Sequence, residues 1–596
     1  FNTAAINVGA LRAPNRFNTS IYNNDQRRFG GQVKAEYKSG DAYAFLSYYN
    51  YRQQESEYRW VDNFLLAAAN ITPTGPTTGS VSRAQHVTSL DWFPIMIGGS
   101  GYQGHFDSKV GDKGSVDLSA GWARQRFDHD TWGFAFQTPV STALAFTFDA
   151  ASLVPTRSGF ATPSFLTNPA NYSRNLINSR NLLTQEDVTN VKASYAWNEQ
   201  GEGWGFKGGA EFRQLERLRD NDEFRFNSAV NFAPFLSSAT QTYSEYGPEP
   251  FVFIDPNAVW NFFKSTPIPI DAARSISGDF TYQEDISALY GQASYTRDAL
   301  RVVGGLRFEA TDFEATASGQ TRKTSGDYTH VLPSVVASYA FSDGLKLRAG
   351  YSQSLGRPNP SDLAITRTEV VDSGGVLNIT QGNPNLQPRE AKNYDLALEY
   401  YFMKGEGFLG GAVFHKDISG DIFTSQVTGA VNGQAARITQ NVNARSSRVS
   451  GLELSAYMGK MPFLPAPWDG LGVSANATFT EGETEFLDGS KIDRRVRQTP
   501  FSGNLAAFFN WNGLEARIAY NYADKYLVLV DREEDAFEQV DASLRYRLTD
   551  RLTVGFEGRN LTDSVRTQID NDNNFSTLFG ETQLGRQYHV RLTYKH

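Results

Sequence analysis

The sequence contains no cysteine, so disulfide bonds and cysteine-based metal or redox sites are excluded. It also lacks any run of about 18 apolar residues, the length that a transmembrane helix requires. Neither charge sign dominates, because 56 basic and 65 acidic residues are interspersed, and this balance argues against nucleic acid as a partner. The seven histidines are scattered without a shared ligand spacing. We therefore expect no metal site, no cofactor and no catalytic constellation, and we do not expect an enzyme.

What the sequence does contain is a repeated alternation of apolar and polar residues. In the stretch 389–402 one parity is apolar and aromatic and the other is polar; the first consists of Tyr394, Leu396, Leu398, Tyr400 and Phe402, and the second includes Asn393, Asp395 and Glu399. A period of two indicates a β-strand with two chemically different faces. The same pattern recurs at 300–310, 345–352, 540–548 and 588–595. The chain is therefore predicted to be all-β.

The connections between these strands differ in length on the two sides of the predicted sheet. Short turns such as Trp511-Asn-Gly and Phe341-Ser-Asp-Gly alternate with long polar and aromatic loops. Short turns on one side and long loops on the other are typical of an outer-membrane barrel, with the short turns in the periplasm. We expect the long external loops near 59–98, 129–184, 220–281, 357–388, 423–446, 484–498, 526–536 and 563–584.

A soluble sandwich would give the same alternation, but its strands would have about five or six residues. Many strands here run for about twelve residues or more, which is long enough to cross a bilayer at a tilt. We therefore expect a large antiparallel transmembrane barrel. Its apolar parity, including Leu396 and Leu398, would face lipid, and its polar parity would face a wet or plugged lumen. Because backbone groups cannot stay unpaired in lipid, the sheet must close on itself.

Several segments resemble one family in the order in which they occur. They are "YSQSLGRPNPSDLA" at 351–364, "GNPNLQPREAKNYDLALEYYF" at 382–402, "SSRVSGLELSAY" at 446–457, "GFEGRNLTDS" at 555–564 and "GRQYHVRLTYKH" at 585–596. Together they are similar to the barrel of TonB-dependent outer-membrane receptors. The resemblance implies a location in the outer membrane of a Gram-negative bacterium. The family usually ends on Phe, whereas this chain ends on His596.

The resemblance also implies an N-terminal plug domain and a short segment that binds TonB, and neither is recognisable in this chain. We count about 19 strands from residue 29 onward, whereas plugged transporters of this type have 22 strands. The expected organisation is an external loop tail at 1–28 and the barrel at 29–596, with the plug and the first strands absent. A surface lipoprotein or a separate N-terminal fragment is a further expected partner.

The resemblance implies active import of a scarce nutrient, energised through TonB and without an ATP site. Among ligands we favour a complex carbohydrate or a similar neutral nutrient, and a siderophore or metal chelate is the alternative within the family. Two readings of another class stay open. One is a passive porin, and the other is the barrel subunit of a multi-chain surface receptor complex.

Two aromatic stretches, 127–137 and 224–263, are the best candidates for ligand contacts. They are predicted to lie on long loops, where binding residues concentrate on a rigid wall. Packing of one loop on another is the simpler explanation for any single ring. A stacking platform for a sugar at the mouth is the functional one. Its predicted contacts are Trp132, Phe134, Phe136, Trp260, Phe262 and Phe263.

One acidic loop resembles a calcium loop in part. Asp570, Asp572, Asn574 and Glu581 fit positions 1, 3, 5 and 12, but Phe575 stands where the sharp turn needs glycine. A solvated external loop is the better interpretation, and the sequence leaves calcium undecided.

Overall fold

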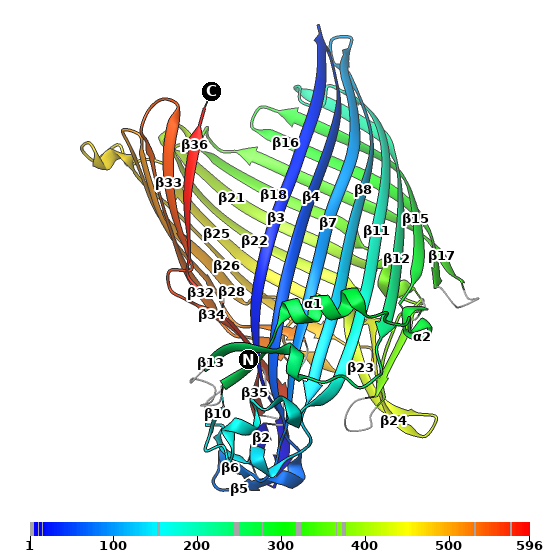
Figure 1. The fold of residues 1–596 in the computed structure, drawn as a ribbon. Helices are drawn as coiled ribbons and strands as arrows, with labels where there is room; N and C mark the ends of the chain where they lie inside the picture. Colours follow the sequence, from blue (N-terminus) through cyan, green and yellow to red (C-terminus); the bar gives the residue numbers. More distant parts are fainter. Residues whose placement is uncertain are drawn as a thin grey trace.

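The computed structural model describes residues 5–9, 11–14, 16–151, 155–242, 250–276, 278–317, 323–364, 366–371, 377–529, 532–572, 575–583 and 585–595. Twenty strands belong to one antiparallel sheet that wraps into a barrel, and one of them, β27, has only two residues, which leaves nineteen long strands. The predicted transmembrane-type barrel and its predicted strand count are therefore confirmed. In Figure 1 the short turns lie at the top and the long loops at the bottom.

Strands that are neighbours in the wall also follow one another along the chain, as in an up-and-down barrel. The strands of the wall are β3 (Arg16–Ser39), β4 (Ala42–Leu65), β7 (Gln85–Val110), β8 (Gly114–Gln137), β11 (Ser173–Trp197), β12 (Gly203–Arg225), β15 (Phe280–Arg297), β16 (Leu300–Ala317), β17 (Lys323–Ala340), β18 (Leu345–Gly356), β21 (Arg389–Phe402), β22 (Gly407–Ser419), β25 (Ser446–Met458), β26 (Leu471–Glu485), β27 (Lys491–Ile492), β28 (Phe501–Trp511), β29 (Leu514–Ala523), β32 (Phe537–Arg547), β33 (Leu552–Arg559) and β36 (Gln587–Tyr594). The described ladders run from β3 through to β36.

Smaller sheets lie in the loops. They are built from β1 (Ala5–Val8) and β2 (Leu11–Pro14); β5 (Ile71–Pro73), β6 (Thr78–Val81), β9 (Phe146–Asp149) and β10 (Thr156–Ser158); β13 (Leu236–Thr242) and β14 (Pro250–Ile254); β19 (Arg367–Val371), β20 (Leu377–Gln381), β23 (Ile422–Val431) and β24 (Gln434–Asn443); and β30 (Tyr526–Leu529), β31 (Arg532–Glu534), β34 (Val565–Asp572) and β35 (Phe575–Gln583).

Helix is confined to short pieces between strands. The α-helices are α1 (Pro256–Ser265), α2 (Ala272–Ile276) and α3 (Pro360–Leu363), and single 3-10 turns are η1 (Ala68–Asn70), η2 (Thr142–Leu144), η3 (Pro163–Phe165), η4 (Pro169–Asn171), η5 (Ala233–Phe235), η6 (Met403–Gly405) and η7 (Trp468–Gly470). None of the helices in the described ranges has the length and apolar character needed to cross a membrane.

The register of the wall places the two parities on opposite faces, as the sequence predicts. In β21, Leu396 and Leu398 are 46% and 47% exposed and lie opposite Val413 and Gly411 of β22. The other parity carries Glu399, which accepts a hydrogen bond of 2.8 Å from Arg348 Nε of β18. Ion pairs thus form on the lumen side, and the apolar row forms the outer face of the barrel.

Tight turns close the ladders at the short-turn end. Trp511 pairs with Leu514, so only Asn512 and Gly513 remain between β28 and β29. Their φ angles are 46° and 82°. An Asn-Gly pair suits a two-residue hairpin turn because both residues tolerate positive φ.

The predicted loop boundaries were wrong where wall strands continue beyond the apolar band. β3 begins at Arg16, so 16–28 is strand and not the tail of a loop. Likewise 59–65, 85–98, 129–137, 173–184 and 220–225 belong to β4, β7, β8, β11 and β12. Above the lipid a strand needs no continuous apolar row. The alternation therefore fades while the ladder continues, and such segments resemble loops in the sequence.

Candidate functional site

The predicted contact residues of 127–137 lie on strand β8 and not on a loop. Trp132, Phe134 and Phe136 share the parity of Leu118, which is 44% exposed on the outer face of the barrel. Phe134 and Phe136 are themselves fully buried. Their surroundings must therefore come from chain that covers the outside of the wall.

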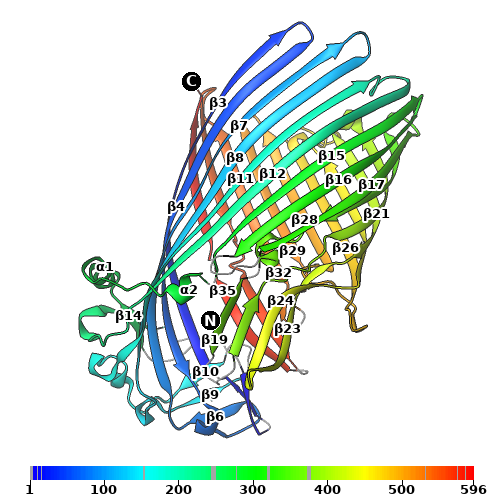
Figure 2. The ribbon, with the colours of Figure 1, turned by 90° about the vertical axis from the view of Figure 1, so that its right-hand side faces the viewer.

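The segment after β12 provides this cover. Figure 2 shows α1 and β14 lying outside the wall that contains β4 and β7. Trp60 Nε1 donates to Ile254 O at 2.8 Å, and Thr88 Oγ1 donates to Val252 O at 2.7 Å. The phenyl ring of Phe134 lies 5.3 Å from that of Phe262 between ring centroids. We call residues 226–242 and 250–276 the outer flap.

The six predicted aromatic residues are thus brought into one cluster, but outside the wall. Trp132 lies 5.4 Å from Trp260 and 4.7 Å from Phe263 between ring centroids. Trp260 is 41% exposed, whereas Phe134 and Phe136 are closed off. Packing of a loop on the wall accounts for the two buried rings. That any of the six contacts a ligand stays a prediction.

A buried polar network helps to hold the loop 138–172 on the same outer face. His86 Nε2 lies 2.5 Å from Asp62 Oδ1, and His86 Nδ1 lies 2.8 Å from Tyr172 Oη. Tyr172 Oη also donates to Leu166 O at 2.9 Å. Asp62 and His86 are both buried, so these hydrogen bonds satisfy polar groups that water does not reach.

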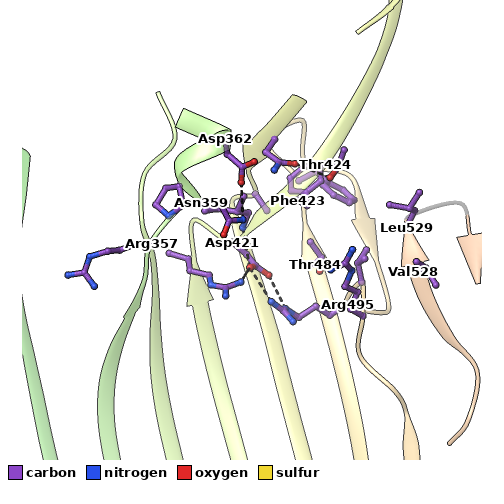
Figure 3. A pocket seen from close by; sticks show the side chains of 18 residues that line it. Arg357, Asn359, Asp362, Asp421, Phe423, Thr424, Thr484, Arg495, Val528 and Leu529 are labelled. Carbon is purple, nitrogen blue, oxygen red and sulfur yellow. Dashed lines mark hydrogen bonds and ion pairs between the residues drawn. The ribbon is translucent and has the colours of Figure 1, made fainter. Parts of the chain in front are cut away.

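A concave site lies at the loop end of the barrel, and its cavity has a volume of about 570 Å³ (Figure 3). Its lining comes from the loop after β18, from α3, from β23, β24 and β30, and from the segment before β28. The charged side chains that line it are Arg357, Asp362, Arg389, Asp421, Arg495 and Arg497, so four arginines and two aspartates give a formal charge of +2. We call this cavity the mouth pocket.

Asp421 is the electrostatic centre of the mouth pocket. Its carboxylate accepts hydrogen bonds from Arg495 Nε at 2.9 Å and from Arg389 Nη1 at 3.3 Å. Figure 3 shows Arg495 reaching Asp421 from another strand connection. Burial acts to raise the pKa of Asp421, but the hydrogen bond and charge of Arg495 outweigh it, so the pKa lies below its usual 3.8. One carboxylate therefore faces two guanidinium groups.

Arg357 is fixed from the wall side of the pocket. Its Nη2 donates to Glu309 Oε2 at 2.7 Å and to Thr311 Oγ1 at 3.1 Å, and both partners are on β16. Burial acts to lower the pKa of Arg357, but Glu309 and neighbouring acids raise it, so the guanidinium stays charged. Rings also line the pocket, since Phe423 and Phe486 meet edge to face with centroids 4.7 Å apart.

The sequence interpretation did not single out this arginine group. Its members stand at 357, 389, 495 and 497, and only the basic run Arg494-Arg495-Val-Arg497 gave a local signal. The long external loop predicted near 357–388 does reach this site, because Pro358, Asn359 and Asp362 line the pocket. The convergence arises because β18, β21, β22, β25, β26 and β28 lie side by side in the wall, and no local pattern encodes that order.

Metal chemistry finds little support in the part of the chain that the structure describes. No group of three or more His, Asp or Glu side chains there could hold a metal ion. In the acidic segment, β34 and β35 form a hairpin in which Asp570 pairs with Thr577 and Thr567 with Glu581. This is an extended hairpin and not a loop wound around an ion, and Asn574 lies outside the described residues.

Comparisons with known proteins agree with this architecture. Residues 139–561 match the family model described as "TonB dependent receptor-like, beta-barrel". No curated protein sequence matches the chain. Among solved structures, the ferric-catecholate import receptor Fiu from E. coli K12 covers 97% of this chain at 12% identity and a TM-score of 0.56, with 81% of its own chain covered. BauA, the ferric preacinetobactin receptor from Acinetobacter baumannii, covers 97% at 13% identity and a TM-score of 0.52, with 79% of its own chain covered.

The family match extends over most of the chain, and the structural likeness concerns the same barrel fold. The chain is therefore an outer-membrane protein of a Gram-negative bacterium, and it belongs to the family of TonB-dependent receptors.

Proposed function

We propose that this barrel imports an anionic nutrient, such as a metal chelate with carboxylate or catecholate groups, and that TonB energises the import through a plug segment. The observation that carries the ligand class is the mouth pocket, in which four arginines stand against two aspartates. Planar guanidinium groups bind such oxyanions with paired, charge-assisted hydrogen bonds. This assignment reverses the order of the two ligand classes that the sequence favoured.

The contacts of Asp421 support a role for Arg389 and Arg495 in which they exchange this internal carboxylate for an oxyanion of the ligand. Arg389 and Arg495 each contact Asp421, and both are partly exposed, with side-chain exposures of 45% and 25%. A ligand oxyanion that enters the pocket can take the place of the internal carboxylate without creating unpaired guanidinium groups. The ligand then crosslinks elements that come from distant parts of the chain.

The aromatic residues predicted to bind a neutral sugar give less support to sugar binding in the lumen, because they lie on the outer face of the wall. Phe134 and Phe136 are buried outside the wall, and Trp132 and Trp260 lie beside them on that face. A neutral oligosaccharide stays the second candidate because Phe423 and Phe486 line the mouth pocket together with the uncharged Thr424, Asn441 and Thr484.

The test is a binding assay with purified barrel and a panel of ferric chelates that carry carboxylate, catecholate or hydroxamate groups, together with a neutral maltooligosaccharide. Arg389→Ala and Arg495→Ala should each weaken binding of an anionic chelate by about 10- to 100-fold, the equivalent of one charge-assisted hydrogen bond. Arg448→Ala is the matched control, because Arg448 pairs with Asp417 on the outer face and is 65% exposed.

Growth of a deletion strain separates the two classes independently. A growth defect under iron limitation that is restored by the wild-type gene and not by the double arginine variant supports the anionic chelate. A defect confined to growth on a neutral glycan, with unchanged iron uptake, would overturn this class.

A further inference from the structure

The connection after β18 turns back over the wall and packs against it. Leu363 and Ala364 at the end of α3, together with Leu386 further along the connection, are at most 2% exposed. They form one apolar cluster with Leu215 of β12 and Tyr282 of β15. We call residues 357–364 and 382–388 the inner shelf.

The inner shelf lies on the lumen face of these strands. Phe212 of β12 is 41% exposed on the outer face, and Leu215 has the opposite parity. Leu289 of β15 is 62% exposed on the outer face, and Tyr282 has the opposite parity. Since successive side chains of a strand point to opposite faces, both contacts of the shelf are inside the barrel.

Hydrogen bonds hold the two arms of the inner shelf together. The N–H of Gly382 donates to Thr366 O at 3.0 Å, and the N–H of Asn383 donates to Asp362 O at 2.6 Å. The arms approach so closely that a Cβ atom at position 382 would stand 1.8 Å from Ala364 O. The shelf is thus one compact unit, and an attachment to the wall at one point can set the position of the whole.

Arg357 provides a polar attachment of this unit to the wall. Its Nη2 donates to Glu309 and Thr311 of β16, and its Nε lies 3.9 Å from Glu284 Oε2 of β15. Glu284, Glu309 and Thr311 are all buried. Tyr282 Oη also donates to Glu284 Oε2 at 3.0 Å. The guanidinium therefore sits among buried acceptors of two wall strands.

The side chain of Arg357 points toward the wall and not toward the centre of the mouth pocket. Figure 3 shows it extending away from Asp421, which accepts hydrogen bonds from Arg389 and Arg495. Its Nη2 and the Glu309 carboxylate are 2.7 Å apart. Its charge is therefore already matched by Glu309, although the residue lines the cavity.

A stiff stretch of backbone joins Arg357 to the part of the shelf that faces the cavity. Pro358 fixes its own φ and restricts Arg357 to extended backbone. Asn359 and Asp362 follow and line the mouth pocket, and Asn359 Nδ2 donates to Asp362 Oδ2 at 3.2 Å. A shift of Arg357 is therefore passed on to both of these polar side chains.

We propose that Arg357 is a positioning residue of the mouth pocket, which fixes the inner shelf against the wall and does not itself bind the ligand. This inference rests on the proposed function, because it assigns a role within the same anion site. Arg389 and Arg495 then contact the ligand, while the anchored shelf holds Asn359 and Asp362 in place along the same cavity. The anchor thus sets the width of the cavity and the size of the chelate that it accepts.

The two possible roles of an arginine give opposite effects when its carboxylate partner is neutralised. If Arg357 bound the ligand, Glu309 would compete with the ligand, and Glu309→Gln would strengthen binding. If Arg357 anchors the shelf, Glu309→Gln weakens the anchor and the binding with it. Neutralisation of Glu309 and neutralisation of Asp421 should therefore change the affinity in opposite directions.

The test is equilibrium dialysis of radioactive ferric citrate against the full chain in detergent. Glu309→Gln and Arg357→Ala should each weaken binding by about 3- to 10-fold, the change expected for loss of one buried hydrogen bond. Arg357→Lys, which keeps a positive charge beside Glu309, should recover part of the loss. Glu314→Gln is the matched control, because Glu314 lies on the same strand and pairs at 2.8 Å with Lys323, where both side chains are exposed.

Two further measurements separate positioning from ligand contact. The salt dependence of binding should be unchanged in Arg357→Ala and reduced in Arg495→Ala, because only the second variant removes a charge that meets the ligand. Without ligand, amide hydrogen exchange of the inner shelf should be faster in Glu309→Gln and Arg357→Ala than in the wild type.

Where binding is sensitive to Arg495→Ala, tighter or unchanged binding by Glu309→Gln would overturn the proposal. Ferric citrate binding that Arg389→Ala and Arg495→Ala leave unchanged would refute the anionic ligand instead. Amide exchange does not involve the ligand, so it then decides the role of Arg357 alone. Faster exchange of the shelf in Glu309→Gln and Arg357→Ala would support the anchor, and unchanged exchange would overturn it.

Discussion

Removal of the charge at Asp421 should strengthen the binding of an anionic ligand in the mouth pocket. Asp421 competes with the ligand, because its carboxylate already occupies Arg495 at 2.9 Å and Arg389 at 3.3 Å. Asp421→Asn keeps the size of the side chain and an oxygen acceptor but removes the negative charge. The two guanidinium groups would then face the ligand without an internal counter-charge.

The expected magnitude follows from the separation of the charges. A ligand oxyanion that contacts the same guanidinium groups would lie roughly 5.5 Å from the Asp421 carboxylate. At an effective dielectric constant of about 20 this costs about 3 kcal/mol before screening. The pocket is open to solvent and salt, so about 1–2 kcal/mol should be observed, or about 5- to 30-fold tighter binding.

The assay is the chelate titration at two salt concentrations, with Asp417→Asn as the matched control. Asp417 is 44% exposed and pairs with Arg448 at 3.4 Å on the outer face, so its charge is lost away from the pocket. The gain for Asp421→Asn should shrink as salt increases. Unchanged or weaker binding by Asp421→Asn, with the barrel folded, would refute the reasoning that this carboxylate competes with the ligand.

Three further outcomes are expected. Because the pKa of Asp421 is lowered below 3.8, its stabilising contacts should be complete above that pH and be lost as the pH falls through the lowered pKa, which hydrogen exchange at the loop 420–445 can follow in acid. Leu398→Arg should weaken barrel assembly by about 2–4 kcal/mol near the bilayer midplane, whereas Asp395→Asn on the lumen face should assemble normally in a heat-modifiability assay, and equal behaviour of the two would place Leu398 away from lipid. Asp62→Leu should leave the buried His86 Nε2 without its hydrogen-bond partner and loosen the loop 138–172 by about 1–3 kcal/mol, and unchanged proteolysis of that loop would contradict a stabilising role for this contact.

The wall could be predicted from the sequence because its signal is local. The alternation around Leu396 and Leu398 identified strand, register parity and the lipid face together, since each is fixed by neighbouring residues of one strand. The number of long strands followed from counting such segments. Where β8 leaves the lipid, its outward residues become charged, and the sequence prediction placed 129–137 in a loop.

The candidate site could be predicted much less well, because its residues meet only when strands from different parts of the sequence pair in the wall. Arg357 follows β18, Arg389 begins β21 and Arg495 precedes β28. Asp421, which follows β22, contacts Arg389 and Arg495, whereas Arg357 pairs with Glu309. The aromatic residues at 127–137 and 224–263 were predicted to lie together, and the structure places them together. The side of the wall on which they gather depends on the fold-back of the outer flap, and no pattern within either stretch specifies that direction.

The two sides of the barrel mouth differ in how the backbone is paired. From β3 to β12 the wall strands have 23 to 26 residues, and their continuous ladders carry the wall beyond the lipid as one sheet. From β28 to β36 the strands have 8 to 11 residues, and the chain above them forms separate sheets that share no ladder with the wall among the described pairings.

The mouth pocket draws Phe423 from the small sheet of β19, β20, β23 and β24, Leu529 from the small sheet of β30, β31, β34 and β35, and Arg495 from the connection between β27 and β28. Because these two sheets share no described ladder with the wall, a change in their position would leave the hydrogen bonds of the wall intact. The mouth pocket is therefore lined by parts whose positions the barrel ladder does not fix.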